Sequence, residues 1–235
     1  MTPYYDEGGI AIYHADCRDV LPRIPALWIP DSGVALIADP PFGFGAYATD
    51  RELDPATFLC TGAHTVALMS YPELLVEWCV KLARAPSEWI TWWPNNATLK
   101  AGGRHKDVPR QTECIAVFGE VYADGVREPR SDNRPRVNGA VIDTVRAGDV
   151  WRDASPGLGF NAAERLHPNE KPLSLMRKLV ALCSREGELV VDPTMGSGTA
   201  LRAAKDLGRR AIGIDLVEAN CETAARRLRQ EVLFT

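Results

Sequence analysis

The sequence predicts an α/β fold in which helices cover both faces of a doubly wound, mostly parallel sheet. Two observations support this class. Short apolar runs of strand length alternate along the chain with segments whose apolar residues recur at helical spacing. Stretches rich in Gly, Pro and Asn separate many of these segments. Because ligands of such sheets bind beyond the carboxyl ends of the strands, functional residues are expected directly after the strands.

The first half of the chain contains a strand that reads as buried on both faces. Residues 34–38 are apolar throughout, and Pro40 and Pro41 prevent the strand from continuing beyond Asp39. Residues 71–85 carry apolar side chains at helical spacing and precede a segment rich in β-formers. The elements expected in this half are strands at 10–14, 34–38, 89–93 and 112–118 and helices at 17–24 and 71–85.

The second half contains helices with recognisable ends. Pro172 suits the first turn of one helix, and Gly208 suits the end of another. The elements expected here are helices at 172–184, 199–207 and 218–231 and strands at 189–191 and 211–214. Residues 119–164 are rich in Gly, Pro, Asn, Asp and Arg and show little periodicity. We therefore expect one domain, residues 1–235, with 119–164 as an insertion on the strand-end rim.

Composition narrows the setting of the protein. No basic cluster followed by an apolar run opens the chain, and no stretch is apolar over the length of a membrane span, so a cytoplasmic location is expected. The six cysteines include no C-x-x-C pair and the four histidines do not cluster near them. Neither a metal site nor a disulfide framework is expected, and a reducing compartment fits.

The charge distribution predicts where a nucleic acid would bind. The net charge of -4 disfavours a surface that is basic throughout, and residues 1–60 hold nine Asp or Glu but only three Arg. Basic residues gather in loop-like sequence in the middle of the chain, where any contact with nucleic acid is expected. They are Lys100, Arg104, Lys106, Arg110, Arg127, Arg130, Arg134 and Arg136.

A small-residue turn between two strands predicts a nucleoside cofactor site. A strand runs into Asp192, Gly196-Ser197-Gly198 follow, and after a helix the next strand ends in Asp215. Glycines let a backbone approach a cofactor closely, and an acid after the next strand can accept hydrogen bonds from ribose hydroxyls. A lone G-x-G is more often a simple tight turn, but the flanking strands and Asp215 favour the cofactor. The full G-x-G-x-x-G pattern is missing, so a cofactor without phosphates is favoured over a dinucleotide.

The end of the 34–38 strand predicts a site for an amino group. Pro40 and Pro41 have no N–H, so the backbone there displays carbonyl acceptors beside the Asp39 carboxylate. Phe42 offers a flat face for a base. An ordinary strand-ending turn explains D-P-P about equally well when it is taken alone.

Three blocks together resemble a known family. D-P-P-F at 39–42, H-P-N-E-K-P at 167–172 and D-P-T-M-G-S-G-T at 192–199 look like the signature blocks of amino-methylating DNA methyltransferases, and their order resembles the circularly permuted beta group. The resemblance covers nearly the whole chain except 119–164, which it makes a probable target-recognition insertion. It implies a Rossmann-like methyltransferase fold that binds S-adenosyl-L-methionine and DNA.

The resemblance assigns roles to residues of this sequence. Asp39, Pro40, Pro41 and Phe42 would form the catalytic set, Asp215 would hold the ribose and Asp16 would contact the cofactor's adenine, although a helix N-cap explains Asp16 equally well. The remaining cofactor contacts would be His167, Asn169, Lys171, Asp192, Thr194, Gly196, Gly198 and Thr199. The family commonly has an aromatic residue in place of Thr194 and a tyrosine in place of Phe42, but stacking needs only a ring.

The implied reaction is direct transfer of a methyl group to the amino nitrogen of a flipped-out adenine. Methylation of the cytosine amino group is the nearest alternative, and the family's tendency towards Asp at position 39 favours adenine. A non-catalytic DNA-binding protein on a decayed methyltransferase fold and a protein-glutamine methyltransferase are further alternatives, which the intact blocks disfavour. The short insertion leaves open whether a second copy of the chain helps to read DNA, and the partnership with a cognate restriction nuclease is also open.

Overall fold

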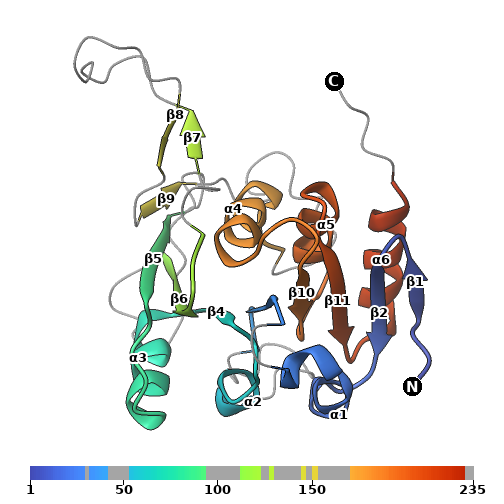
Figure 1. Cartoon of the computed structure of the whole chain (residues 1–235), viewed down its shortest axis with the longest axis horizontal. Helices are drawn as coiled ribbons and strands as arrows, with labels where there is room; N and C mark the ends of the chain where they lie inside the picture. Colours follow the sequence, from blue (N-terminus) through green and yellow to red (C-terminus); the bar gives the residue numbers. More distant parts are fainter. Residues whose placement is uncertain are drawn as a thin grey trace.

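The computed structural model describes residues 1–29, 32–41, 53–93, 112–122, 127–129, 144–146, 150–152 and 170–230. Within these residues, nine strands form one sheet in the order β1-β2-β11-β10-β3-β4-β6-β5-β9 (Figure 1). Its strands are β1 (Tyr5–Glu7), β2 (Ile10–His14), β3 (Val34–Ala38), β4 (Thr65–Ser70), β5 (Glu88–Trp93), β6 (Glu113–Gly119), β9 (Val150–Arg152), β10 (Leu189–Asp192) and β11 (Arg210–Asp215). A separate two-stranded sheet joins β7 (Arg127–Pro129) to β8 (Thr144–Arg146).

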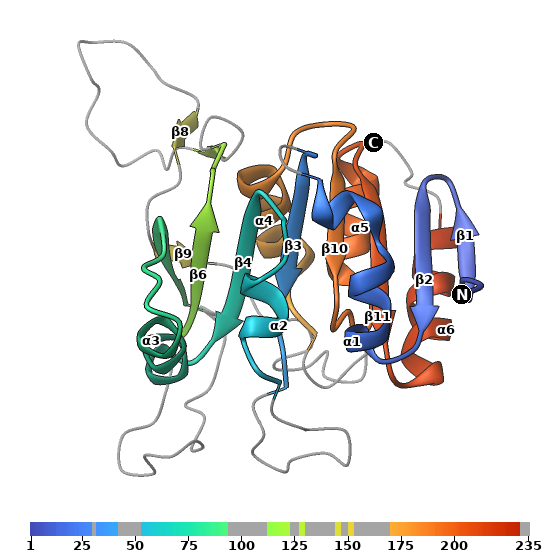
Figure 2. The same ribbon diagram turned by 60° about the horizontal axis from the view of Figure 1, so that its bottom comes forward.

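The centre of the main sheet is parallel. Neighbouring strands from β2 through β11, β10 and β3 to β4 all pair in parallel, whereas β6 is antiparallel to both of its neighbours. Figure 2 shows this opposition, since the arrowheads of β2 and β4 point to the bottom of the view and that of β6 points up. The carboxyl ends of the parallel strands therefore meet at one edge, and the predicted doubly wound class is confirmed.

Helices cover both faces of the sheet (Figure 1). Ala35 and Ile37 of β3 pack into the core formed with α4 to α6, and Val34, Leu36 and Ala38 pack into the core formed with α1 to α3. Because both faces of β3 are covered, all five of its residues are buried, which explains its uninterrupted apolar sequence. The helices are α1 (Cys17–Val20), α2 (Ala56–Leu59), α3 (Pro72–Lys81), α4 (Leu173–Cys183), α5 (Thr199–Asp206) and α6 (Glu218–Arg229), with 3-10 turns η1 (Leu21–Arg23) and η2 (Pro25–Trp28).

The structure differs from the sequence expectations in several places, and β1 and α2 are among the elements that were not expected. The apolar strand β4, which lies between β3 and β6, was not expected. The expected helix at 17–24 is divided into α1 and η1, and a proline stands at the start of the second piece. The segment 119–164 does not lie wholly outside the sheet, because β9 pairs in parallel with β5 and its Trp151 is buried.

None of the described helices has both the length and the apolar composition that a membrane span requires.

Candidate functional site

Three carboxylates meet at the carboxyl edge of the sheet. Asp192 ends β10 and Asp215 ends the neighbouring β11, while Asp39 directly follows β3 on the other side of β10. Burial, together with the charges of Asp39 and Asp215, raises the pKa of Asp192 to about 8, although the hydrogen bond from the Thr194 N–H acts to lower it. The strand order therefore brings these three acids to adjacent strand ends at one edge of the sheet.

Asp215 holds the small-residue turn in place. Its Oδ2 accepts a hydrogen bond of 2.9 Å from the backbone N–H of Gly196. Its Oδ1 accepts from the Val217 N–H over 2.8 Å and from the Asn220 side-chain amide over 3.0 Å. An ionised carboxylate offers about four acceptor positions, so Asp215 retains capacity for a ligand hydroxyl.

The glycines of the turn have left-handed backbone conformations. Gly196 has φ of 52° and Gly198 has φ of 74°. A Cβ atom at Gly198 would lie 2.7 Å from the Cβ of Ala224 in α6. The sequence predicts that Gly198 allows close approach to a ligand. In the structure, helix α6 packs against the α-carbon of Gly198. The tight packing of α6 therefore also requires glycine here.

The chemistry of the turn fits a nucleoside cofactor such as S-adenosylmethionine. The Thr194 hydroxyl is buried and no described residue forms a hydrogen bond with it. The backbone N–H of Thr194 donates to Asp192 Oδ1 over 3.1 Å, which fixes the start of the turn. A buried hydroxyl and the spare acceptor positions of Asp215 therefore stand at the same strand ends, as polar groups of a ligand would require.

In the described contacts, Lys171 binds Asp39 and not the glycine turn, residues 192–199. Its Nζ donates to Asp39 Oδ2 over 2.6 Å and lies 3.2 Å from Glu113 Oε2 in β6. It also lies 5.9 Å from the centre of the Trp92 ring. Burial alone would lower the pKa of Lys171, but the charges of Asp39 and Glu113 outweigh burial and raise it. The resemblance made Lys171 a cofactor contact, and that role stays a prediction.

Arg227 is a residue of the site that the sequence did not single out. From α6, its Nη1 donates to Glu170 Oε1 over 2.7 Å and to Thr199 Oγ1 over 3.1 Å, and it lies 3.4 Å from Ser197 Oγ. It thus joins the block at 167–172 to the glycine turn. The sequence around Arg227 resembles any amphipathic helix with basic residues in its last turn, so no local signal distinguishes it.

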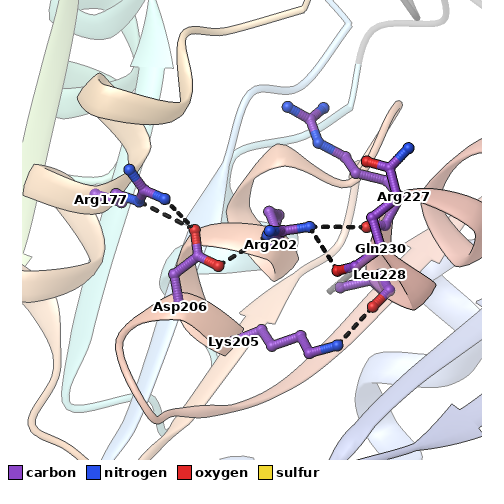
Figure 3. A network of polar contacts seen from close by, with 7 residues as sticks. All are labelled: Arg177, Arg202, Lys205, Asp206, Arg227, Leu228 and Gln230. Carbon is purple, nitrogen blue, oxygen red and sulfur yellow. Dashed lines mark hydrogen bonds and ion pairs between the residues drawn. The ribbon is translucent and has the colours of Figure 1, made fainter. Parts of the chain in front are cut away.

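Side chains of α5 fasten the end of α6, which carries Arg227 (Figure 3). Arg202 and Lys205 donate to three terminal carbonyl groups over 2.5–3.2 Å. Asp206 accepts from Arg202 over 2.8 Å and from Arg177 of α4 over 3.0 Å. The three carbonyl groups belong to Arg227, Leu228 and Gln230. Helices α4, α5 and α6 are therefore linked behind the glycine turn.

Asp16 is placed beside this site with a local role. It is the N-cap of α1 and accepts from the Arg18 N–H over 2.9 Å, and its carboxylate pairs with the Arg18 guanidinium. The preceding β2 is the neighbour of β11, so α1 begins at the same edge of the sheet as Asp215. The predicted contact with the adenine of the cofactor remains untested.

The remaining predicted residues cannot be placed in full. Phe42, His167 and Asn169 lie outside the described residues, and Arg127 is described only as backbone in β7. Trp92 is buried, and His64 Nε2 forms a hydrogen bond of 3.2 Å with the Tyr122 hydroxyl. The other predicted DNA contacts also lie outside the described residues, as does Arg110. They are Lys100, Arg104, Lys106, Arg130, Arg134 and Arg136.

Within the described part of the chain, no three His, Cys, Asp or Glu side chains are grouped to hold a metal ion.

Comparison with known sequences finds DNA-modifying relatives. Residues 69–226 match the family described as DNA methylase, N6_N4_Mtase. The Type II methyltransferase M.HpaI of Haemophilus parainfluenzae is 32% identical over 148 residues, which make up 62% of this chain and 46% of that protein. The Type II methyltransferase M.BamHI of Bacillus amyloliquefaciens is 33% identical over 270 aligned positions, covering 98% of this chain and 60% of that protein. The chain thus spans about half the length of these two curated relatives.

Comparison with solved structures finds the same fold. The crystal structure of the M1.HpyAVI-SAM complex has a TM-score of 0.60 and 21% identity, covering 93% of this chain and 99% of that one. The PvuII DNA methyltransferase, described as cytosine-N4-specific, has a TM-score of 0.63 and 12% identity, covering 99% of this chain and 90% of that one. At these identities the likeness establishes the architecture.

Proposed function

The chain belongs to the DNA methylase family, and from this membership and its site we propose that it methylates the exocyclic amino group of adenine in DNA. The methyl donor is S-adenosylmethionine. The observation that carries the proposal is the position of Asp39 and Pro40. They directly follow the fully buried β3, beside the strands that end in Asp192 and Asp215.

Asp39 and the backbone after it would orient the amino group. The lone pair of a base amino nitrogen is delocalised into the ring, so the nitrogen is a weak nucleophile until it becomes pyramidal. Hydrogen bonds from its two N–H groups to the Asp39 carboxylate and the Pro40 carbonyl would favour the pyramidal form in the transition state. No covalent enzyme intermediate is needed for this transfer.

The residues of the glycine turn would hold the cofactor. Asp215 would accept hydrogen bonds from the ribose hydroxyls, and the turn from Asp192 to Thr199 would hold the methionine end. When bound, S-adenosylmethionine supplies an electrophilic methyl group on a sulfonium. The buried Thr194 hydroxyl and the remaining acceptor positions of Asp215 support this placement.

The target base must leave the DNA stack before it can reach Asp39. Phe42 would stack on the flipped base and replace part of the stacking energy of the duplex. The basic residues predicted at 100–106 and 127–136 would contact the DNA backbone, and 119–164 would serve as the recognition segment. DNA is the proposed partner, and a second copy of the chain and a companion nuclease stay predictions.

Adenine is the first choice of target because Asp occupies position 39. The cytosine amino group is the second candidate, and the fold shared with a cytosine-N4-specific enzyme supports it. The two amino groups could be held by the same acceptors, so the geometry of Asp39 alone does not separate them.

Nucleoside mass spectrometry after reaction with labelled S-adenosylmethionine tests the proposal. We expect N6-methyladenine, and we expect the label to disappear with Asp39→Ala and nearly disappear with Asp39→Asn, because an amide can present a donor where an acceptor is needed. Retained cofactor binding in both variants would show that their defect lies in the transfer step. Methylated cytosine alone would overturn the choice of base, and full activity of Asp39→Ala would overturn the mechanism.

A further inference from the structure

We propose that Lys171 is a positioning residue that keeps the carboxylate of Asp39 ionised and aimed at the target amino group. The inference rests on the proposed catalytic role of Asp39. It assigns Lys171 to the residues that hold the methyl-accepting base, in place of the cofactor contact that the sequence resemblance implies.

The geometry of Lys171 supports this role. Its side chain is 10% exposed and that of Asp39 is 24% exposed, and the bond between them is 2.6 Å long. The ammonium group engages Oδ2 of Asp39. A charge-assisted bond of this length restricts the rotation of the carboxylate, and each carboxylate oxygen has further lone pairs for an incoming N–H.

The surrounding charges explain why a cation is needed. Glu113 lies on the other side of the ammonium group, and the charge of Asp39 acts on the buried Asp192. Lys171 carries a positive charge that offsets the charges of Asp39 and Glu113. Without this cation, the charge of Glu113 and burial would favour the protonated form of Asp39. A protonated carboxyl group would present a donor to the amino group, which needs acceptors.

Lys171 also stands next to a residue that is linked to the glycine turn through Arg227. Glu170 binds Arg227, which in turn binds Thr199, while Lys171 binds Asp39. One of two consecutive residues is therefore linked indirectly to the glycine turn, and the other directly contacts Asp39. Any displacement of this short segment would move both groups, so the position of Asp39 is tied to the position of the turn.

The pH dependence of single-turnover methylation, measured with saturating cofactor and DNA, tests the proposal. Removing the cation in Lys171→Met should shift the acid limb of the rate profile upward by about 1–3 pH units. Lys171→Arg, which keeps the charge, should hold the limb near its wild-type position. Glu113→Gln removes a competing carboxylate and should shift the limb to lower pH.

Titration of the Asp39 carboxyl carbon by ¹³C NMR gives a readout that does not depend on turnover. The resonance is assigned by its absence in Asp39→Asn, and its midpoint should rise in Lys171→Met and fall in Glu113→Gln. If Lys171→Met does not fold, Glu113→Gln still decides, because an unmoved midpoint there overturns the inference. A lower rate with an unmoved midpoint in Lys171→Met would show a structural role only.

The Asp39→Ala variant separates the two proposals. If it retains full activity, the catalytic assignment of Asp39 fails. If it is inactive while the Lys171 and Glu113 variants leave the acid limb and the NMR midpoint unchanged, only the role of Lys171 fails.

Discussion

Arg227 and Glu170 form an ion pair of 2.7 Å that joins the last helix of the fold to the segment leading into α4. Their side chains are 12% and 6% exposed, so the pair is largely shielded from solvent. Because Arg227 also binds Thr199, one guanidinium group supports two of the three blocks that define the family resemblance.

Replacing Arg227 should weaken both the fold and the cofactor site. In Arg227→Met the buried Glu170 loses this cation, so the free energy of unfolding should fall by about 3–5 kcal/mol in urea denaturation. Cofactor affinity measured by calorimetry should fall as well, since Thr199 loses a donor. Arg226→Met, at the exposed neighbouring position, should change neither quantity. Equal effects of the two substitutions would contradict the role of the pair.

Gly198→Ala should destabilise the protein more than alanine does at a glycine that has a similar positive φ but open space around it. Its φ of 74° costs an L-residue about 1–2 kcal/mol, and the new Cβ would collide with Ala224. Gly8→Ala is the matched control, because φ is 61° and no atom lies within 4 Å of its Cβ. The double variant Gly198→Ala/Ala224→Gly should relieve the collision but not the backbone strain. Thermal and urea unfolding measure all three, and equal destabilisation at Gly8 and Gly198 would rule out the collision.

The raised pKa of Asp192 should make stability depend on pH. Between about pH 4, where an unfolded aspartate titrates, and about pH 8, the folded state holds a proton that the unfolded state has released. The unfolding free energy contributed by this group therefore falls as the pH rises through that window. Asp192→Asn should remove this slope. The unfolding free energy of the variant relative to that of wild type should therefore be higher at pH 8 than at pH 5. The exposed Asp6→Asn serves as control, and parallel pH profiles of Asp192→Asn and wild type would refute the effect.

Asp215→Ala should abolish measurable binding of S-adenosylmethionine by calorimetry. The substitution removes the acceptor proposed for the ribose and also frees the Gly196 N–H that shapes the turn. Asn220→Ala removes only one donor to the same carboxylate and should retain binding. Wild-type affinity in Asp215→Ala would place the cofactor elsewhere.

Neutralising basic residues in the middle of the chain should weaken DNA binding and flatten its dependence on salt. Each DNA phosphate that the variant no longer neutralises should reduce the slope of log K against log salt by about 0.9. The variant combines alanine at Lys100, Arg104 and Lys106. Arg210→Gln is its control, because Arg210 begins β11 at the edge of the sheet opposite the candidate site. If both proteins show the wild-type slope, DNA binds another face.

The sequence by itself determined the fold class and the local form of the two central blocks. The apolar run of β3, stopped by two prolines after Asp39, predicts a covered strand whose end is functional, and the structure contains that strand. The series of strand, glycine turn, helix and strand ending in Asp215 was likewise readable. These features depend on backbone preferences and on burial of neighbouring residues, which act over a few positions and leave a pattern in the chain.

Only the tertiary structure decided which groups act on one another. Lys171 and Asp39 are 132 positions apart, and Glu170 and Arg227 are 57 apart, so neither contact leaves a local pattern. The packing of Ala224 against Gly198 and the pairing of β9 with β5 at the edge of the sheet likewise leave no local pattern. Each depends on the order in which strands and helices pack, because side chains distant in sequence meet only after the whole sheet and its helices are assembled.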